Sequence, residues 1–295
     1  MRAPTSCVIV TLLATVVRSL LRCDQVERQP YPEFHLVRQC SRSKMAVVAG
    51  TNWITSLQRC KDFALVKRGL AFNFHPPGAA LGSKMASCVV CECPEFQSLG
   101  SLEVDSAFDY YSMYAGPLPT PNHTCVPGVG VFRVHPRPAN FTQARQVCHS
   151  EDGELPSVIT EARTVGLAQL VTTALSGTGI KRAFVGLDDR DTEGRYVTGK
   201  GEPLSCFDYR AWAPGEPRDR REDDDCACVD SKQQWRIVRC ADKLPFLCEL
   251  LPGNTRLGNS ASVVPPLRRP GDNVQTTQSG NNGMPLSRCV FKPEM

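Results

Sequence analysis

The sequence has little net charge. Its 295 residues contain 34 lysines and arginines against 30 aspartates and glutamates, which gives +4 at pH 7. It has no basic stripe with interleaved aromatic residues, and these two features together exclude a nucleic-acid-binding surface. It also has no internal repeat. With 41% hydrophobic residues, the chain is long enough to bury one large or two small cores.

The sequence also lacks the short motifs of common catalytic chemistry. There is no GxSxG, no HExxH and no glycine-rich phosphate loop. His149 follows Cys148, which we expect to be oxidised, so we interpret it as a surface helix residue and not as a base. The five histidines stand apart without a partner motif: His35, His75, His123, His135 and His149. The sequence therefore predicts that the protein is not an enzyme.

The N-terminal apolar run is too short to span a membrane. It extends from Cys7 to Val17 and follows Arg2, in the order of a secretory signal peptide. We place cleavage after the small residue Ser19, with cleavage near Cys23 or a short membrane anchor as the alternatives. The sequence therefore predicts a secreted, extracellular protein.

Cysteines, in contrast, are abundant. Fifteen of them in an exported chain predict a disulfide framework, because the export route is oxidising. Cleavage after Ser19 leaves fourteen, an even number. Two sequons, at Asn122 and Asn140, fit export and predict glycosylated surface positions. The sequence leaves the partners of eight cysteines open: Cys23, Cys40, Cys60, Cys88, Cys91, Cys93, Cys125 and Cys289.

The chain divides into segments of different composition. The tail lacks apolar periodicity and is predicted to be disordered. Cys289 lies in this tail, where a disulfide to a second copy of the chain is an option. The predicted segments are a signal peptide (1–19), an N-terminal segment (20–39), a first domain (40–115), a proline-rich linker (116–124), a second domain (125–251) and the tail (252–295).

The first domain combines a predicted helix with a predicted strand. Apolar residues recur at helical spacing from Ile54 to Ala64, and Gly69 is a natural stop. The stretch LAFNF, residues 70–74, alternates as a half-buried strand does.

The cluster Cys88, Cys91 and Cys93 has three interpretations. CxxC followed by CxC resembles zinc-ligand spacing, but the other half of a zinc site is absent and secreted thiolates tend to be oxidised. A redox CxxC needs a nearby cation to lower a thiol pKa, and the flanking residues offer none. We therefore predict structural disulfides from this cluster to Cys60 and Cys40.

Together, the helix with Cys60, the strand LAFNF, the CxC motif and the closing FDYYSMYA resemble the PAN/apple-like modules of secreted proteins. The resemblance implies a small α+β domain in which a helix lies across an antiparallel sheet and is stapled to it by disulfides.

The second domain carries an ordered set of motifs. One helix is predicted with Asn140 as N-cap and Gln143 in the capping-box position, and a second from Thr160 to a stop at Gly177. Short strands are predicted at AFVGL, GRYV, CACVD, QWRIVRC and PFLCEL. The two helices, FVGLDD, WAPGEP, DC, QWxxxxC and PFLCE, in this order, resemble a C-type lectin-like domain. The resemblance implies an α+β fold with two helices, two small antiparallel sheets and a long loop region.

The resemblance also implies two disulfides, Cys148–Cys248 and Cys226–Cys240. Cys206 and Cys228 are additional to the family's basic set. Because they flank the EPR loop, we predict that they pair and clamp it. Five residues are assigned to the core: Phe184, Leu187, Trp212, Trp235 and Phe246.

Members of this family that bind sugars do so through a calcium ion with oxygen ligands. The usual ligands are Glu-Pro-Asn or Gln-Pro-Asp, a Glu two residues before the cysteine, and Asn-Asp after the tryptophan. Here Glu216 matches and Asp224 is a shorter carboxylate, but Arg218, Arg236 and Ile237 do not match. A guanidinium about 4 Å from a divalent ion costs on the order of 8 kcal/mol at an effective dielectric of about 20. We therefore predict a degenerate sugar site, with the two arginines bridging the two carboxylates as ion pairs.

The resemblance offers a second metal site as well. Some members hold an auxiliary calcium with carboxylates of the LDDRDTEG segment and of the acidic loop. The alternative is a solvated charge run that Arg220 and Arg221 neutralise. No cofactor is required, and a structural calcium ion is the one that the sequence allows. The candidate ligands are all acidic: Asp189, Glu193, Asp219, Asp224 and Asp225.

The predicted function is that of a secreted, non-enzymatic binding or extracellular-matrix protein. Its partner is an extracellular protein or a glycan held without calcium, with no nucleic acid and no membrane span. Secreted arthropod proteins with this two-module order, some linked to cuticle and apical extracellular matrix, are similar. The alternative is a carbohydrate-binding lectin in recognition or immunity, and glycan binding with and without EDTA separates the two.

Overall fold

The structure is a computed structural model that describes Cys23 and residues 33–51, 53–76, 87–96, 101–115, 123–218 and 223–253. The predicted signal peptide, most of the linker and of the tail, and five discussed residues lie outside the described residues: Asn122, Asp219, Arg220, Arg221 and Cys289. The chain divides into two compact units. The N-terminal unit is Pro32–Phe132 with Leu250–Met295, and the C-terminal unit is Arg133–Glu249 with Met1–Tyr31.

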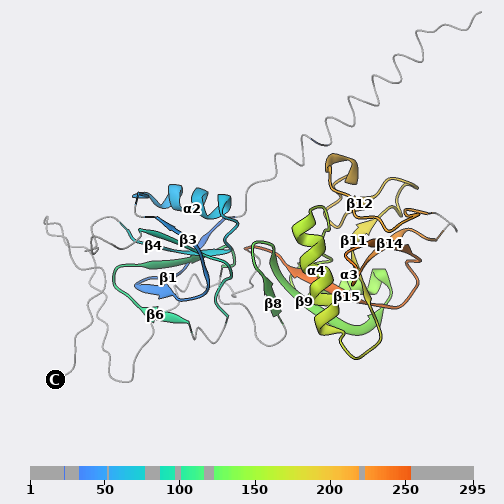
Figure 1. Cartoon of the computed structure of the whole chain (residues 1–295), viewed down its shortest axis with the longest axis horizontal. Helices are drawn as coiled ribbons and strands as arrows, with labels where there is room; N and C mark the ends of the chain where they lie inside the picture. Colours follow the sequence, from blue (N-terminus) through green and yellow to red (C-terminus); the bar gives the residue numbers. More distant parts are fainter. Residues whose placement is uncertain are drawn as a thin grey trace, which may run out of the picture. The chain divides into compact units, whose positions relative to one another are not determined.

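The N-terminal unit is built on a five-stranded sheet whose pairs are all antiparallel. Its strand order is β1 (His35–Arg38), β7 (Asp109–Ser112), β4 (Ala71–Phe74), β5 (Cys88–Cys91) and β3 (Val47–Thr51). Helix α2 (Leu57–Val66) lies along one face of this sheet (Figure 1). A second, two-stranded sheet pairs β2 (Ser41–Ser43) with β6 (Leu102–Val104), and β8 (His123–Val126) pairs with β9 (Gly130–Ala139). The unit is a disulfide-bonded, β-rich domain.

The cysteines of β5 face opposite sides of the sheet. Cys88 forms a disulfide with Cys60 of α2. Cys91 is three residues further along the strand, so its side chain points to the other face, where it packs with Ala71 and Tyr110. It is a buried free thiol, and burial raises its pKa to about 12. The predicted disulfide between this cluster and Cys60 is therefore confirmed, and Cys91 takes no part in it because its side chain lies on the opposite face of the strand.

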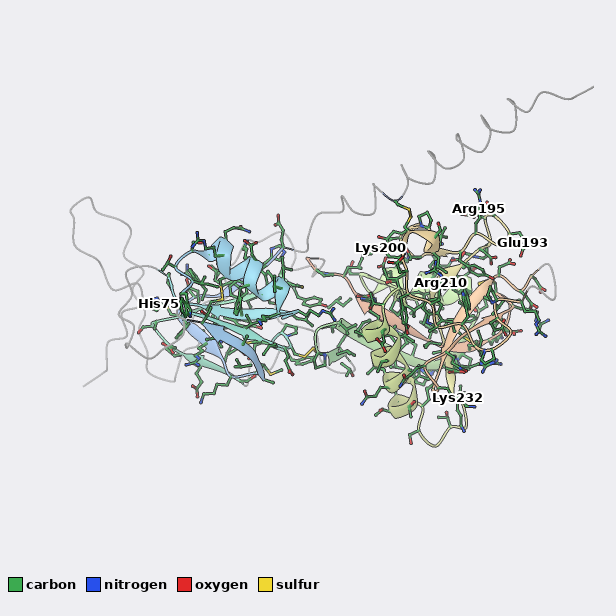
Figure 2. The ribbon with its side chains drawn as sticks, turned by 45° about the horizontal axis from the view of Figure 1, so that its top comes forward. His75, Glu193, Arg195, Lys200, Arg210 and Lys232 are labelled. Carbon is green, nitrogen blue, oxygen red and sulfur yellow. A yellow bond between two sulfur atoms is a disulfide. The ribbon has the colours of Figure 1, made fainter. Side chains whose placement is uncertain are left out.

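The other cysteines that the structure describes in this unit are oxidised. Cys93 bonds to Cys125, and Cys40 is also disulfide-bonded. The predicted disulfide between the cluster and Cys40 is wrong, because Cys88 and Cys93 have other partners and Cys91 is a free thiol. Because Cys88 and Cys93 are both consumed in disulfides, the zinc and redox interpretations of the cluster do not fit the structure. The histidine of this unit that Figure 2 labels, His75, is buried with its ring 6.0 Å from that of Phe108.

Helix α2 ends differently from the prediction. Its C-cap is Lys67, and the residue that takes the left-handed conformation after the helix is Arg68 (φ +55°), not the predicted stop Gly69. Gly69 is needed for close packing instead, because a Cβ at this position would lie 2.1 Å from Cγ1 of Val90. A side chain there would push the end of the helix away from β5.

The C-terminal unit is built on a sheet with the strand order β14–β13–β11–β15–β9. Its strands are β11 (Arg182–Asp188), β13 (Cys226–Asp230), β14 (Trp235–Val238) and β15 (Leu244–Leu250), together with most of β9. Two short strands, β10 (Gly153–Glu154) and β12 (Val197–Thr198), pair with β15 and β11. Four of the five predicted core residues are buried here; Trp212 is half-buried.

Two helices flank this sheet. Helix α3 (Phe141–Ser150) begins with both hydrogen bonds of the predicted capping box between Asn140 and Gln143. Helix α4 (Glu161–Ala174) is capped by Thr160 and packs on β11 and β13. Both helix starts are local features, which is why the sequence alone locates them.

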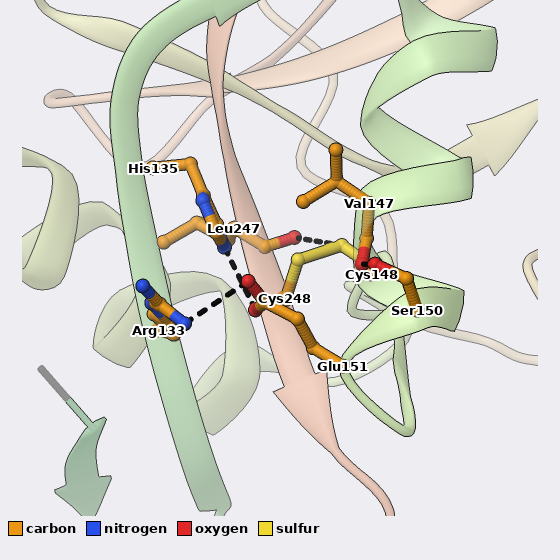
Figure 3. A network of polar contacts seen from close by, with 8 residues as sticks. All are labelled: Arg133, His135, Val147, Cys148, Ser150, Glu151, Leu247 and Cys248. Carbon is orange, nitrogen blue, oxygen red and sulfur yellow. Dashed lines mark hydrogen bonds and ion pairs between the residues drawn. A yellow bond between two sulfur atoms is a disulfide. The ribbon is translucent and has the colours of Figure 1, made fainter. Parts of the chain in front are cut away.

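A polar cluster joins the end of α3 to β9 beside the Cys148–Cys248 disulfide (Figure 3). One carboxylate oxygen of Glu151 accepts a bond from Nη1 of Arg133 at 3.0 Å, and the other lies 3.1 Å from Nε2 of His135. The His135 ring also stacks on Phe246, with centroids 4.5 Å apart. Burial lowers the pKa of His135, and the charge of Glu151 opposes this only in part.

We expect the C-terminal unit to lose stability below about pH 6.5, the ordinary pKa of histidine. Because the pKa of His135 is lower in the folded state, the unfolded chain takes up the proton first and is favoured in acid. His135→Gln removes this titration and retains a donor for Glu151. Its free energy of unfolding should therefore fall less than that of the native chain between about pH 8 and about pH 5.5, measured by urea titration.

His149→Gln is the matched control, because it removes an exposed imidazole from the same unit. Its pH profile should follow that of the native chain. Profiles that are equally flattened in both variants would contradict the role given to His135.

Candidate functional site

The long loop between β12 and β13 is anchored on the first residue of β14. The amide of Trp235 donates to the carbonyl of Ala211 (2.7 Å), and the carbonyl of Trp235 accepts from the amide of Ala213 (2.9 Å). These two backbone bonds hold the WAPGEP segment next to the WRIV strand. The two halves of the predicted sugar site are therefore brought together by backbone pairing.

A cluster of aromatic rings in the core packs around the side chain of this anchoring residue, Trp235. The ring of Trp235 is fully buried, with the rings of Trp212 and Tyr209 edge-on to it at 5.3 and 5.6 Å. Its Nε1–H donates to Oγ1 of Thr164 on α4 at 3.0 Å, and that hydroxyl donates to the carbonyl of Val158 at 3.1 Å. The position of the site is thus set by the core and not by the loop.

In the EPR turn, the side chain of Arg218 folds back onto the backbone of the same turn. Oε2 of Glu216 accepts the amide N–H of Arg218 (3.1 Å), and Nε of Arg218 donates to the carbonyl of Gly215 (3.2 Å). Gly215 has φ +82°, and a Cβ there would lie 2.7 Å from Nη2 of Arg218. The peptide bond between Glu216 and Pro217 is cis. The arginine therefore caps the turn through a backbone carbonyl, not through a carboxylate.

Arg236 is held by a residue that the sequence analysis did not consider. Its Nε donates to Oδ2 of Asp230 (2.8 Å), and its Nη2 donates to Oε1 of Gln234 (3.2 Å). The hydrogen bond with Asp230 raises the pKa of Arg236. The predicted ion pairs of Arg218 and Arg236 with Glu216 and Asp224 are therefore wrong.

The hairpin register explains why Asp230 is the partner. Arg236 lies opposite Cys228 in the antiparallel pair of β13 and β14, and Asp230 is two residues further along on the same face. Alternation within CACVD and WRIV was the signal that could have identified this diagonal pair. The neighbouring Ile237 lies opposite Ala227 and brings no oxygen atom to the site.

Two of the candidate auxiliary calcium residues are neighbours in the structure, because the amide N–H of Asp189 donates to the carbonyl of Asp225 at 3.1 Å. Asp189 is 2% exposed and accepts the amide N–H of Gly194 at 2.9 Å, which closes the turn that follows β11. Glu193 is exposed at the tip of this turn (Figure 2). Within the described ranges, no three carboxylates of the set Asp189, Glu193, Asp224 and Asp225 have oxygens within 4.8 Å of one another. These four carboxylates by themselves therefore form no group of three converging ligands.

Three side chains of the types that bind metals do lie together in the part of the chain that the structure covers: His135, Glu151 and Cys248. The sulfur of Cys248 is bonded to Cys148, so it is not available as a thiolate ligand. This cluster is therefore structural.

The disulfides of the C-terminal unit differ from the prediction at one place. The structure contains Cys148–Cys248 and Cys226–Cys240, as the resemblance implies. Cys206 bonds to Cys23 instead of Cys228. Cys228 is a free thiol with no exposed surface, and burial raises its pKa to about 12.

The predicted Cys206–Cys228 clamp is therefore wrong. Cys228 lies two residues after Cys226 on the same face of β13, and both pack in the core between the sheet and α3. Cys206 lies in the short helix η1 (Leu204–Cys206) and is only half-buried. A thiolate at Cys228 is disfavoured by its apolar surroundings, so this cysteine is inert.

Asn140 combines two roles. Its Oδ1 accepts the amide N–H of Gln143 at 2.8 Å to cap α3, and it is also the first residue of a sequon. A glycan attaches to Nδ2, which leaves Oδ1 in place, so capping and glycosylation are compatible. None of the described helices is long and apolar enough to cross a membrane.

Comparison with known proteins agrees with this geometry. The profile of the lectin C-type domain matches residues 137–250. Pulmonary surfactant-associated protein D of Bos taurus is 30% identical over 139 residues, which are 47% of this chain and 35% of that protein. The hemolymph lipopolysaccharide-binding protein of Periplaneta americana is 27% identical over 140 residues, 46% of this chain and 55% of that protein. The chain thus spans about a third to a half of these relatives.

Among solved structures, human lithostathine aligns with a TM-score of 0.37 at 26% identity, over 41% of this chain and 91% of that chain. C-type lectins are non-enzymatic binding proteins that often bind calcium, so the prediction of a non-enzymatic protein is confirmed for residues 137–250. The N-terminal unit is not identified as a PAN/apple module by any of these matches. Residues 137–250 are a C-type lectin domain.

Proposed function

We propose that the lectin domain binds an extracellular protein or a glycan without a bridging calcium ion, in a secreted, non-enzymatic protein of the extracellular matrix. The observation that carries the proposal is the pairing of Arg236 with Asp230 at 2.8 Å. This pairing places a cation where calcium-dependent sugar binding requires a neutral or acidic oxygen ligand.

The other positions of the site support the same proposal. Ile237 has no oxygen ligand, and the guanidinium of Arg218 lies against Gly215. Glu216 and Asp224 are the carboxylates that remain, and two carboxylates do not complete the six to eight oxygens that calcium takes. A bridging calcium ion therefore lacks most of its ligands.

The proposal also covers the signal cleavage site, the N-terminal unit and the location of the protein. We place signal cleavage after Ser19, since the Cys23–Cys206 disulfide requires Cys23 in the mature chain. For the N-terminal unit we propose a PAN/apple-like module, supported by the Cys60–Cys88 bond that staples α2 to the sheet. The disulfides fit an extracellular matrix location, with cuticle as one such matrix.

The alternative is a carbohydrate-binding lectin of recognition or immunity. It is favoured by the relative from Periplaneta americana, whose name states that it binds lipopolysaccharide. Under this alternative, microbial glycans are bound by the same domain.

A glycan array probed with the full secreted chain tests both functions. We expect the same bound glycans, or the same absence of binding, in about 2 mM calcium and in excess EDTA, because no ligand is bridged by the metal. Binding to microbial glycans that EDTA abolishes would overturn the proposal and favour the alternative. The thermal melt of the chain, recorded in the same two buffers, measures stabilisation by an auxiliary calcium separately.

A further inference from the structure

A groove of about 560 Å³ lies at one end of the lectin domain, where β11 begins and β13 ends. Its charged lining residues are four cations and one carboxylate: Lys181, Arg182, Arg236, Lys243 and Asp230. The other lining residues are apolar or glycine, and none of them is aromatic.

The single carboxylate is already occupied. Asp230 is 8% exposed; its Oδ2 accepts from Arg236, and its Oδ1 accepts the amide N–H groups of Lys232 (2.8 Å) and Gln234 (3.1 Å). The charges of Asp230 and Arg236 therefore neutralise each other in an internal ion pair. The net charge that the groove presents to solvent comes from the other three cations.

These three cations have no counter-charge of their own. Lys181, Arg182 and Lys243 are exposed, and none of the ion pairs in the described ranges includes them. Three positive charges around one concave surface repel one another, and an anionic ligand relieves that repulsion.

Strand register explains why the cations converge. In the parallel pair of β11 and β15, Phe184 lies opposite Phe246, so the segments before these residues emerge at the same end of the sheet. Lys181 and Lys243 precede β11 and β15 there. The carbonyl of Lys181 is also fixed by the amide of Ser231 at 2.8 Å. The cations are thus placed by the starts of two paired strands: Arg182 is the first residue of β11, and Lys181 and Lys243 directly precede β11 and β15.

We propose that this groove binds a sulfated polysaccharide. Sulfate groups accept charge-assisted hydrogen bonds from ammonium and guanidinium groups, and they need no metal ion to do so. Apolar lining such as Ile180 and Leu244 suits the C–H faces of sugar rings. Because the lining has no aromatic ring on which bases could stack, the groove does not resemble a single-stranded nucleic-acid site. The inference rests on the proposed function, in which the ligand is held without calcium.

Immobilised heparin is the probe, and the full secreted chain is measured in EDTA. The double variant Arg182→Gln/Lys243→Gln is expected to bind at least about tenfold more weakly than the native chain, because two charge-assisted contacts are lost. Lys181→Gln should weaken binding in the same direction. All three residues are exposed, and melting curves verify that the variants remain folded.

The matched control is Arg145→Gln/Arg195→Gln, which also removes two exposed positive charges. Arg145 lines a different cavity of about 110 Å³. Arg195 lies at the end of the domain opposite Lys232, whose amide bonds to the groove residue Asp230 (Figure 2). Heparin affinity of this control should stay within about twofold of the native value at about 0.15 M salt.

Four results would overturn the inference. Three of them are an equal loss of affinity in the control, undiminished binding of chemically desulfated heparin, and binding of single-stranded RNA as tight as that of heparin. The fourth is absence of heparin binding. If heparin does not bind but other glycans bind in EDTA, the proposal for the groove is wrong and the proposed function is not contradicted. Calcium-dependent binding of neutral sugars overturns the proposed function instead.

Discussion

Replacing both Cys148 and Cys248 by alanine is expected to lower the free energy of unfolding of the lectin domain by about 4 to 5 kcal/mol. The disulfide closes a loop of 100 residues, and in the chain-entropy model the stabilisation grows with the logarithm of loop length. Both residues are buried, so small cavities add to the loss. With a typical stability of about 5 to 15 kcal/mol, this loss is a large part of the total.

Guanidinium titration followed by tryptophan fluorescence measures this effect. Trp235 is fully buried in the lectin domain, whereas Trp53 of the N-terminal unit is 83% exposed and changes little on unfolding. The matched variant is Cys226→Ala/Cys240→Ala, whose loop has 14 residues and for which the model gives about 3 kcal/mol. A larger loss in the short-loop variant would contradict the assignment of the stabilisation to loop closure.

Trp235→Ala is expected to cost about 3 to 5 kcal/mol, the usual loss for a large buried aromatic side chain. The substitution also removes the packing partner of Trp212 and Tyr209 beneath the long loop. Circular dichroism is the readout, since the substitution removes the fully buried tryptophan and also changes the surroundings of Trp212. Trp53→Ala is the matched control, and its high exposure predicts a change within about 0.5 kcal/mol.

Thr164→Val separates the hydrogen bond from the packing. The variant keeps the shape of the side chain but leaves Nε1–H of Trp235 buried without its acceptor, at a cost of about 1 to 3 kcal/mol. Thr172→Val changes an exposed threonine of the same helix and should be nearly neutral. Equal effects at Thr164 and Thr172 would show that the buried bond contributes nothing.

The proposed loss of calcium-bridged sugar binding concerns the side chains of the site and not its backbone framework. Backbone pairing of Trp235 with Ala211 and Ala213 preserves the geometry that joins the loop to β14. On β14, the side chain of Arg236 is bound to Asp230 and that of Ile237 has no oxygen atom. The positive charge nearby suits an anion instead of a cation.

Local signals were sufficient for several features. The capping box of Asn140 and Gln143 involves four consecutive residues, and the strands CACVD and PFLCEL are marked by their apolar content. The ordered motifs from FVGLDD to PFLCE indicated the C-type lectin fold of residues 137–250. The mismatch at Arg218, Arg236 and Ile237 was visible without any coordinates.

The sequence by itself thus determined the local elements, the lectin fold and the mismatch with the usual calcium-ligand motif, because these depend on neighbouring residues or on motif order. The tertiary structure alone decided which groups meet: Cys206 with Cys23, Arg236 with Asp230, and Lys181 with Lys243 around one groove. Such pairs depend on which face of a strand a residue occupies and on the register between strands. Residue spacing along the chain does not specify either, since a shift of one residue exchanges the two faces of a strand.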